Sequence, residues 1–310
     1  TLYLSGNNSG FSGQTIIDAG SLVFNKNTIN DTYFGGTTII NGNGTLEYNL
    51  SAADTINGNV SGSGVLKKSG NSTLTLSGNN SGFGGTTNIN QGTITFTRTT
   101  TGDQYFGGTT NIYGTLNFDI QTDYTLSGKL AQNGTFNKTG SGTLSVTGDQ
   151  SGFSGIANIN GGILNFNKTT TTDKFFAGIT NVNANSTLEY TTGINDTLNG
   201  KINGEGTFIK DGTAELTLSG KNNVFGGHTI IENGIINYQQ SYGGSYFSSS
   251  NEIRQNGVLN FTNNSEDNVN TLSSTGTLNK NGSGTLNLNK NNINFAGTIN
   301  INEGKITYNK

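Results

Sequence analysis

The stretch Gly92-Thr93-Ile94-Thr95-Phe96 carries the pattern that decides the fold: a glycine, an aliphatic residue two places later, and a ring two places after that. Thirteen copies follow one another, with lysine in place of the ring in every third copy and Ser186 in place of one glycine. We call the thirteen central residues the ladder. They are Leu22, Leu46, Leu66, Ile94, Leu116, Phe136, Leu164, Leu188, Phe208, Ile236, Leu259, Leu278 and Ile306. Apolar and polar residues that alternate in this way are typical of β-strands with one buried face.

The spacing of the ladder defines a repeat. Successive ladder residues are 24, 20 and 28 residues apart, and similar spacings recur three more times. Three short units therefore form a long repeat, at 1–72, 73–142, 143–214 and 215–284, with a partial repeat at 285–310. A fixed period of 20 to 30 residues indicates a solenoid in which each unit is one coil.

These observations predict the fold class. We expect an all-β chain, one continuous single-stranded parallel β-helix (β-solenoid) of about thirteen coils over residues 1–310. It should be right-handed, because parallel crossovers generally are. The ladder should form one buried axial stack along it.

Composition agrees with a solenoid. Only 30% of the 310 residues are apolar and 11% are charged, with 48 glycines and no proline, cysteine, methionine or tryptophan. An ordinary globular domain of this length would lack core, whereas a coil needs only its inward positions filled. The absence of proline suits continuous strand pairing. Asparagine pairs such as Asn88 with Asn90, Asn158 with Asn160 and Asn300 with Asn302 could hydrogen-bond between coils.

Four lysines occupy the ring position of every third copy: Lys68, Lys138, Lys210 and Lys280. Burying an unpaired ammonium group is costly. We therefore expect each amine to reach solvent along its apolar stem.

Several segments resemble a known bacterial family. Lys138-Thr139-Gly140-Ser141-Gly142-Thr143-Leu144, followed by Gly152-Phe153-Ser154-Gly155 and by Asn160-Gly161-Gly162-Ile163-Leu164-Asn165-Phe166, resembles the passenger-associated transport repeat of autotransporters. The match recurs four times and begins a fifth time at Lys280. This resemblance implies an autotransporter (type V secretion) passenger, exported through a C-terminal translocation β-barrel of the parent protein and attached to the outer membrane of a Gram-negative bacterium. It also implies an adhesin, or the stalk of one, on the cell surface.

The sequence contains no signal peptide and no initiator methionine, and both ends fall directly on a repeat. We therefore expect the chain to be a fragment of a larger passenger.

Charge and residue types exclude several kinds of site. The net charge is −3, from 16 basic and 19 acidic residues scattered singly, so we expect no nucleic-acid partner and no direct insertion into a membrane. With one histidine, His228, and no cysteine, we expect no metal site and no cofactor.

Parallel β-helices also include polysaccharide-acting enzymes and tailspike-like glycan binders, and these form the alternative function. Asp31, Asp103 and Asp173 recur at equivalent places three coils apart, which is roughly 14 Å at about 4.8 Å per coil. Glycosidases need two carboxyl groups about 5–9.5 Å apart. Arg98 and Arg254 could clamp a uronate, but they lie in unrelated contexts. We expect no enzymatic activity and no catalytic residues.

The loops between the first and second coils of each long repeat are the candidate recognition surface. They are residues 25–32, 97–104, 167–174 and 239–245, which vary in sequence while keeping their place. Each is followed by a ring that should point outward: Tyr33, Tyr105, Phe175 and Tyr246. These rings are candidate contacts for a host-cell or bacterial surface protein or glycan. Alternatively, they cover the corner of the helix against their own loop.

Overall fold

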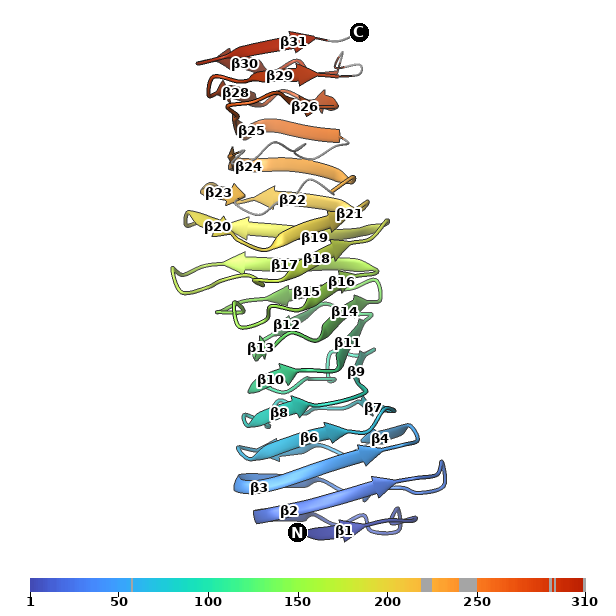
Figure 1. Cartoon of the computed structure of the whole chain (residues 1–310). Helices are drawn as coiled ribbons and strands as arrows, with labels where there is room; N and C mark the ends of the chain where they lie inside the picture. Colours follow the sequence, from blue (N-terminus) through green and yellow to red (C-terminus); the bar gives the residue numbers. More distant parts are fainter. Residues whose placement is uncertain (57, 219–224, 240–249, 290–291, 293, 309–310) are drawn as a thin grey trace. The chain divides into compact units, whose positions relative to one another are not determined.

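The computed structural model describes residues 1–56, 58–218, 225–239, 250–289, 292 and 294–308, and over these residues it is all-β with no helix. Its strands run parallel and stack as a β-solenoid, about 14 turns in all, which confirms the predicted fold class (Figure 1). The chain divides into two compact units, Thr1–Ala157 and Asn158–Lys310. The boundaries of the long repeats, their continuity as one segment and the right-handed sense stay predictions.

Most strands have three to seven residues, whereas β2, β3, β24 and β25 have 12 or 13. Unit 1 contains β1 (Leu2–Leu4), β2 (Thr15–Lys26), β3 (Thr38–Leu50), β4 (Asp54–Ile56), β5 (Val60–Gly62), β6 (Val65–Ser69), β7 (Thr73–Leu76), β8 (Thr86–Ile89), β9 (Thr93–Arg98), β10 (Thr109–Ile112), β11 (Thr115–Ile120), β12 (Tyr124–Leu126), β13 (Lys129–Ala131), β14 (Thr135–Thr139) and β15 (Thr143–Val146). The unit boundary falls within β16 (Ile156–Ile159). Unit 2 contains β17 (Gly162–Lys168), β18 (Ile179–Val182), β19 (Ser186–Thr192), β20 (Asp196–Leu198), β21 (Lys201–Gly204), β22 (Thr207–Asp211), β23 (Glu215–Leu218), β24 (His228–Gln239), β25 (Ser250–Thr262), β26 (Asp267–Val269), β27 (Thr271–Ser273), β28 (Thr277–Asn281), β29 (Thr285–Leu288), β30 (Thr298–Ile301) and β31 (Lys305–Tyr308).

In unit 1 the ladder residues form two separate columns rather than one. Leu22 pairs with Leu46, and Leu46 pairs with Leu66. The next partner of Leu66 is Thr87, not Ile94. Ile94 instead lies in a second column, which runs from Asp54 through Leu74 to Ile94 and continues through Leu116 to Phe136.

Unit 2 repeats this arrangement. Leu164, Leu188 and Phe208 are in register, and the next partner of Phe208 is Thr229. A new column runs from Asp196 through Leu216 and continues through Ile236, Leu259 and Leu278.

The prediction of one axial stack is therefore wrong, although every ladder residue except Ile306 is buried. The physical reason is that the 28-residue spacing is not one long coil. From Leu66 the next turn closes at Thr87, and Ile94 lies further round, on the neighbouring face. Each long repeat thus contains more than three turns, which explains why the structure has about 14 turns instead of about thirteen.

The four lysines of the ladder pattern are buried, so the prediction that their amines reach solvent is wrong. Lys68, Lys138, Lys210 and Lys280 are each 0% exposed. The ammonium group of Lys68 donates to the carbonyl oxygens of Ser69 at 2.8 Å, Gly70 at 2.8 Å and Gln91 at 3.3 Å. Lys210 and Lys280 each make the corresponding three bonds, at 2.6 to 3.2 Å. We call this arrangement the carbonyl cage.

Backbone geometry forms the carbonyl cage. Gly70, two residues after Lys68, has φ of 74°, a conformation that turns its carbonyl back and that side chains with a Cβ rarely adopt. Burial lowers the pKa of Lys68, Lys138 and Lys210 to about 8. Because these values lie above 7, the amines are mostly protonated at neutral pH and use their hydrogens on the carbonyl oxygens.

Asparagine side chains hydrogen-bond between coils, as predicted. In unit 2, Asn260 donates to Asn237 at 2.7 Å, Asn279 to Asn260 at 2.8 Å, and Asn300 to Asn279 at 2.8 Å. In unit 1, Asn111 donates to Asn88 at 2.8 Å. These rows of asparagine side chains connect neighbouring strands on the outward face, in addition to the hydrogen bonds between the strand backbones.

Candidate functional site

Three of the rings proposed as contacts lie among the described residues, and all three are buried. Tyr33 is 7% exposed, Tyr105 1% and Phe175 6%. The expectation that these three rings point outward is therefore wrong, and they cover the corner of the solenoid instead. The fourth, Tyr246, lies outside the described residues.

Each described ring belongs to an aromatic cluster. The Tyr105 ring centroid lies 4.7 Å from that of Phe106, 4.8 Å from Phe118 and 5.5 Å from Phe96. Its hydroxyl lies 3.1 Å from the Thr110 Oγ1. Tyr105 and Phe106 lie between β9 and β10, where strand alternation does not apply, and both consecutive rings are buried. Burial raises the pKa of the equivalent ring, Tyr33, to about 12.

The loops of unit 1 do not share one edge of the solenoid. The first loop follows β2, which belongs to the sheet with β3, β6 and β8. The second follows β9, which belongs to the sheet with β4, β7 and β11. The offset between columns therefore places the two loops on different faces, so these two loops do not form one continuous recognition surface.

An aspartate closes each of the three described loops. Asp31 Oδ2 accepts hydrogen bonds from the backbone amides of Asn27 at 2.9 Å and Thr28 at 3.0 Å. Asp103 and Asp173 accept the corresponding pairs of amides at 2.8 to 3.1 Å. The hydrogen bond from the Thr28 amide contributes most to lowering the pKa of Asp31. These recurring carboxylates therefore organise turns.

A buried cation holds the base of each described loop, and we call these residues the loop clamps: Lys26, Arg98 and Lys168. Each donates to the backbone carbonyl of the loop aspartate, at 2.6 Å in the bond from Lys168 to Asp173. Arg98 also donates through Nε to the carbonyls of Thr122 and Asp123, both at 3.2 Å. Because its guanidinium group is committed to the backbone, Arg98 is not placed to clamp a uronate.

The loop clamps differ in the residue that faces them from the start of a later strand. Lys26 pairs with Asp54 Oδ1 at 3.3 Å, and Lys168 pairs with Asp196 Oδ1 at 3.2 Å. In the second loop the guanidinium carbon of Arg98 instead lies 4.9 Å from the centroid of the Tyr124 ring. The first and third loops therefore have a lysine–aspartate ion pair, whereas the second has a cation–π contact between arginine and tyrosine.

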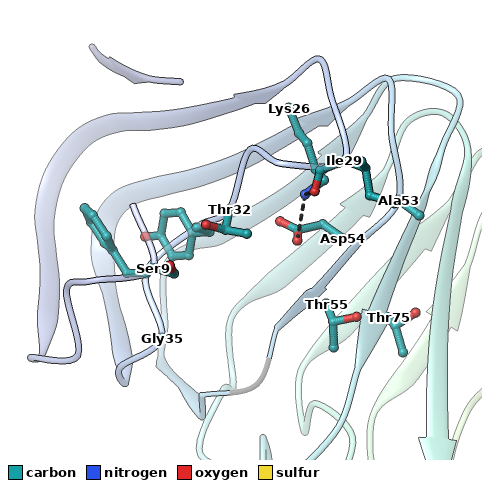
Figure 2. Close-up of a pocket in the computed structure, with 11 residues that line it drawn as sticks. Ser9, Lys26, Ile29, Thr32, Gly35, Ala53, Asp54, Thr55 and Thr75 are labelled. Carbon is teal, nitrogen blue, oxygen red and sulfur yellow. Dashed lines mark hydrogen bonds and ion pairs between the residues drawn. The ribbon is translucent and has the colours of Figure 1, made fainter. Parts of the chain in front are cut away.

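A cavity of about 330 Å³ opens beside the first loop (Figure 2). Its lining includes Lys26, Ile29, Thr32 and Tyr33 from the loop region and Asp54 from β4. Figure 2 shows the Lys26 amine directed at the Asp54 carboxylate, with Thr32 beside them and Thr55 and Thr75 further along the cavity. Sequence inspection missed this cavity, because Lys26 and Asp54 lie 28 residues apart and meet only through the coil register.

A second polar group lies on the outward face of unit 2. Arg254 pairs with Glu252 at 2.8 Å and with Glu232. His228 Nε2 lies 3.5 Å from Glu252, and its Nδ1 lies 2.5 Å from the Ser250 hydroxyl. The register of β24 with β25 brings these residues together. The number of residues in one turn of the solenoid is therefore the sequence signal from which this group could have been predicted.

Two kinds of feature are absent from the described residues. They contain no group of three or more histidine, cysteine, aspartate or glutamate side chains placed to hold a metal ion. They also contain no helix long and apolar enough to span a membrane.

Comparison with protein families identifies the repeat. The Passenger-associated-transport-repeat model matches five times, at residues 1–24, 66–96, 136–166, 208–237 and 278–307. The second match begins at Leu66, the last ladder residue of one column, and reaches Phe96 beside Ile94 of the next column, so it contains the carbonyl cage of Lys68. A parallel β-solenoid with this repeat is an autotransporter passenger domain, and the chain belongs to that family. The family implies a secreted, surface-exposed segment of a Gram-negative bacterium. Searches of curated proteins and of solved structures returned no match.

Proposed function

We propose that this chain is the extracellular passenger segment of a bacterial surface autotransporter, attached to the outer membrane, that supports adhesion to host cells or to other bacteria. The observation that carries the proposal is the fivefold match to the passenger repeat along a parallel solenoid. In such a solenoid, alternate strand residues fill the core and the backbone pairs with neighbouring coils. The loops are the parts free to vary and to meet a partner.

The proposal includes no catalysis. It is supported by the occupation of the groups that a polysaccharide-acting enzyme would use. The loop aspartates accept backbone amides, Arg98 holds a loop, and Arg254 is paired with glutamates. Incubation with neutral and acidic polysaccharides should therefore release no reducing ends and no unsaturated uronates. Release at a rate above that of a heat-unfolded sample would favour the enzyme alternative.

Adhesion is tested with the 310-residue chain itself. Fluorescently labelled protein should bind cultured epithelial cells, or bacteria that lack the parent protein, in a saturable manner that unlabelled protein competes. Heat-unfolded protein is the control, because it has the same composition without the solenoid. Binding that is neither saturable nor competed would refute adhesion by this segment and would favour an inert stalk.

A further inference from the structure

The cavity beside the first loop has the size of a small-molecule site. Its volume is about 330 Å³, at the lower end of the roughly 300–1,000 Å³ common for ligand pockets. The lining comes from several successive coils, from Ser9 through Asp54 to Thr75. The cavity therefore opens sideways between coils rather than at one strand edge.

One buried acceptor in this cavity has no partner. The Asp54 side chain is 9% exposed, and its Oδ1 pairs with the Lys26 amine at 3.3 Å. Its Oδ2 is buried and accepts no hydrogen bond. A buried carboxylate oxygen without a donor is unfavourable, and a ligand that donates to it would relieve that cost.

In the other two described loops, side chains of the protein itself contact the residue equivalent to Asp54. In the third loop, Asp196 pairs with Lys168 in the same way, but its Oδ2 accepts a hydrogen bond from the Tyr190 hydroxyl at 2.5 Å. In the second loop, Tyr124 replaces the aspartate and lies against Arg98. Among the three loops that the structure describes, only the first has an Asp54-type carboxylate with an oxygen that accepts no hydrogen bond.

The chemistry of the lining limits the ligand. The Lys26 amine already donates to Ile29 O, Asp31 O and Asp54 Oδ1, so it neutralises the carboxylate and has no hydrogen left to donate. The ligand must therefore bring donors and does not need a charge. Threonine hydroxyls at Thr32, Thr55 and Thr75 add polar partners. The Tyr33 and Phe34 rings, 4.8 Å apart, and Ile29, which is 81% exposed, add apolar surface.

We infer that this cavity binds one saccharide unit, whose hydroxyl groups donate to Asp54 Oδ2 while its apolar ring face lies against the aromatic and Ile29 surface. A saccharide combines several donors with an apolar face and carries no required charge. The inference rests on the proposed adhesion, because the saccharide would be part of a glycan on the bound surface.

Saturation-transfer NMR with the 310-residue chain and a panel of methyl glycosides tests the inference, followed by titration of any glycoside that binds. Asp54→Asn removes the charged acceptor and should weaken binding about tenfold or more. Asp196→Asn is the matched control and should change affinity less than about twofold, because Tyr190 already occupies that carboxylate. Thr55→Trp is a second variant, since exposed Thr55 lines the cavity and a large side chain there should block it without touching the core.

The outcomes separate the cavity from the adhesion. Loss of binding in Asp54→Asn and Thr55→Trp, with circular dichroism unchanged, supports the saccharide site. Glycoside binding that survives both substitutions, or no binding by any glycoside of the panel, overturns it. Saturable cell binding without glycoside binding would leave the adhesion intact and refute the cavity. Glycoside binding without cell binding would refute the adhesion and leave the saccharide site in the cavity intact.

Discussion

Replacing Lys68 by methionine removes the donor of a carbonyl cage while keeping the length and apolar stem of the side chain. Three carbonyl oxygens, of Ser69, Gly70 and Gln91, lose their ammonium partner. Each buried acceptor left without a donor costs about 1–3 kcal/mol. Against this, burial lowers the pKa of Lys68 from 10.5 to about 8, so relief of the buried charge returns ~3 kcal/mol at neutral pH. At about 2 kcal/mol for each of the three acceptors, less the ~3 kcal/mol returned, we expect a net loss of about 3 kcal/mol at pH 7.

The effect should depend on pH in a defined direction. The pKa of Lys68 is lower in the folded chain than in the unfolded chain, so below pH 8 both states are protonated and the cost of burial is present in full. Between pH 8 and 10.5 the folded chain releases a proton that the unfolded chain still holds, and the wild type gains stability. The methionine variant lacks this gain, so its deficit should widen over that interval.

The assay is urea unfolding followed by far-UV circular dichroism, at pH values from 7 to about 10. Hydrogen exchange at the amides near Gly70 and Gln91 would localise the effect, since solenoid stability is largely a sum of neighbouring coils. Lys67→Met is the control, because Lys67 is the adjacent residue of β6 and is not buried. A Lys68 variant as stable as the wild type at pH 7, or no more affected than the control, would refute the role of the cage.

Two further substitutions test the corner and the turn. Tyr105→Ser should destabilise the chain by about 3–5 kcal/mol and lower its melting temperature, because the ring is buried in an aromatic cluster. Tyr113→Ser is the control and should leave the melting temperature nearly unchanged, because that ring is 52% exposed. Equal effects of the two substitutions would contradict the corner packing. Gly70→Ala should cost about 1–3 kcal/mol in urea unfolding, because φ is 74° and a Cβ there would lie 2.3 Å from the Leu50 carbonyl oxygen. Gly10→Ala, where a Cβ would meet no atom within 4 Å, is its control, and a Gly70 variant as stable as this control would argue against the strained turn.

The solenoid could be predicted from the sequence because each coil repeats the same alternation. The offset between columns could not, because a spacing of 28 residues fits either one long coil or one turn followed by a move to the next face. Only the pairing of Leu66 with Thr87 distinguishes them. In the sequence, a threonine that fills a buried column cannot be distinguished from a threonine that faces outward.

The wrong predictions for the side chains have the same origin, which is that alternation fails where strands end. Tyr33 follows a loop and precedes Phe34, yet both rings face the corner, with centroids 4.8 Å apart. The cost of burying an unpaired ammonium group predicts that Lys68 reaches solvent, but backbone carbonyl oxygens at the end of β6 pair with the buried amine. The cavity at Asp54 was missed because its residues converge only through the coil register.

The shift from one column to the next has a consequence for how such genes can change. Recombination between similar repeats can delete or duplicate one long repeat without breaking strand pairing, because every coil offers the same edges. The loops downstream of such an event would then project from a different face, since the first and second loops of unit 1 already arise from different sheets. A change in repeat number would therefore alter the direction in which each downstream loop is presented, as well as the length of the protein.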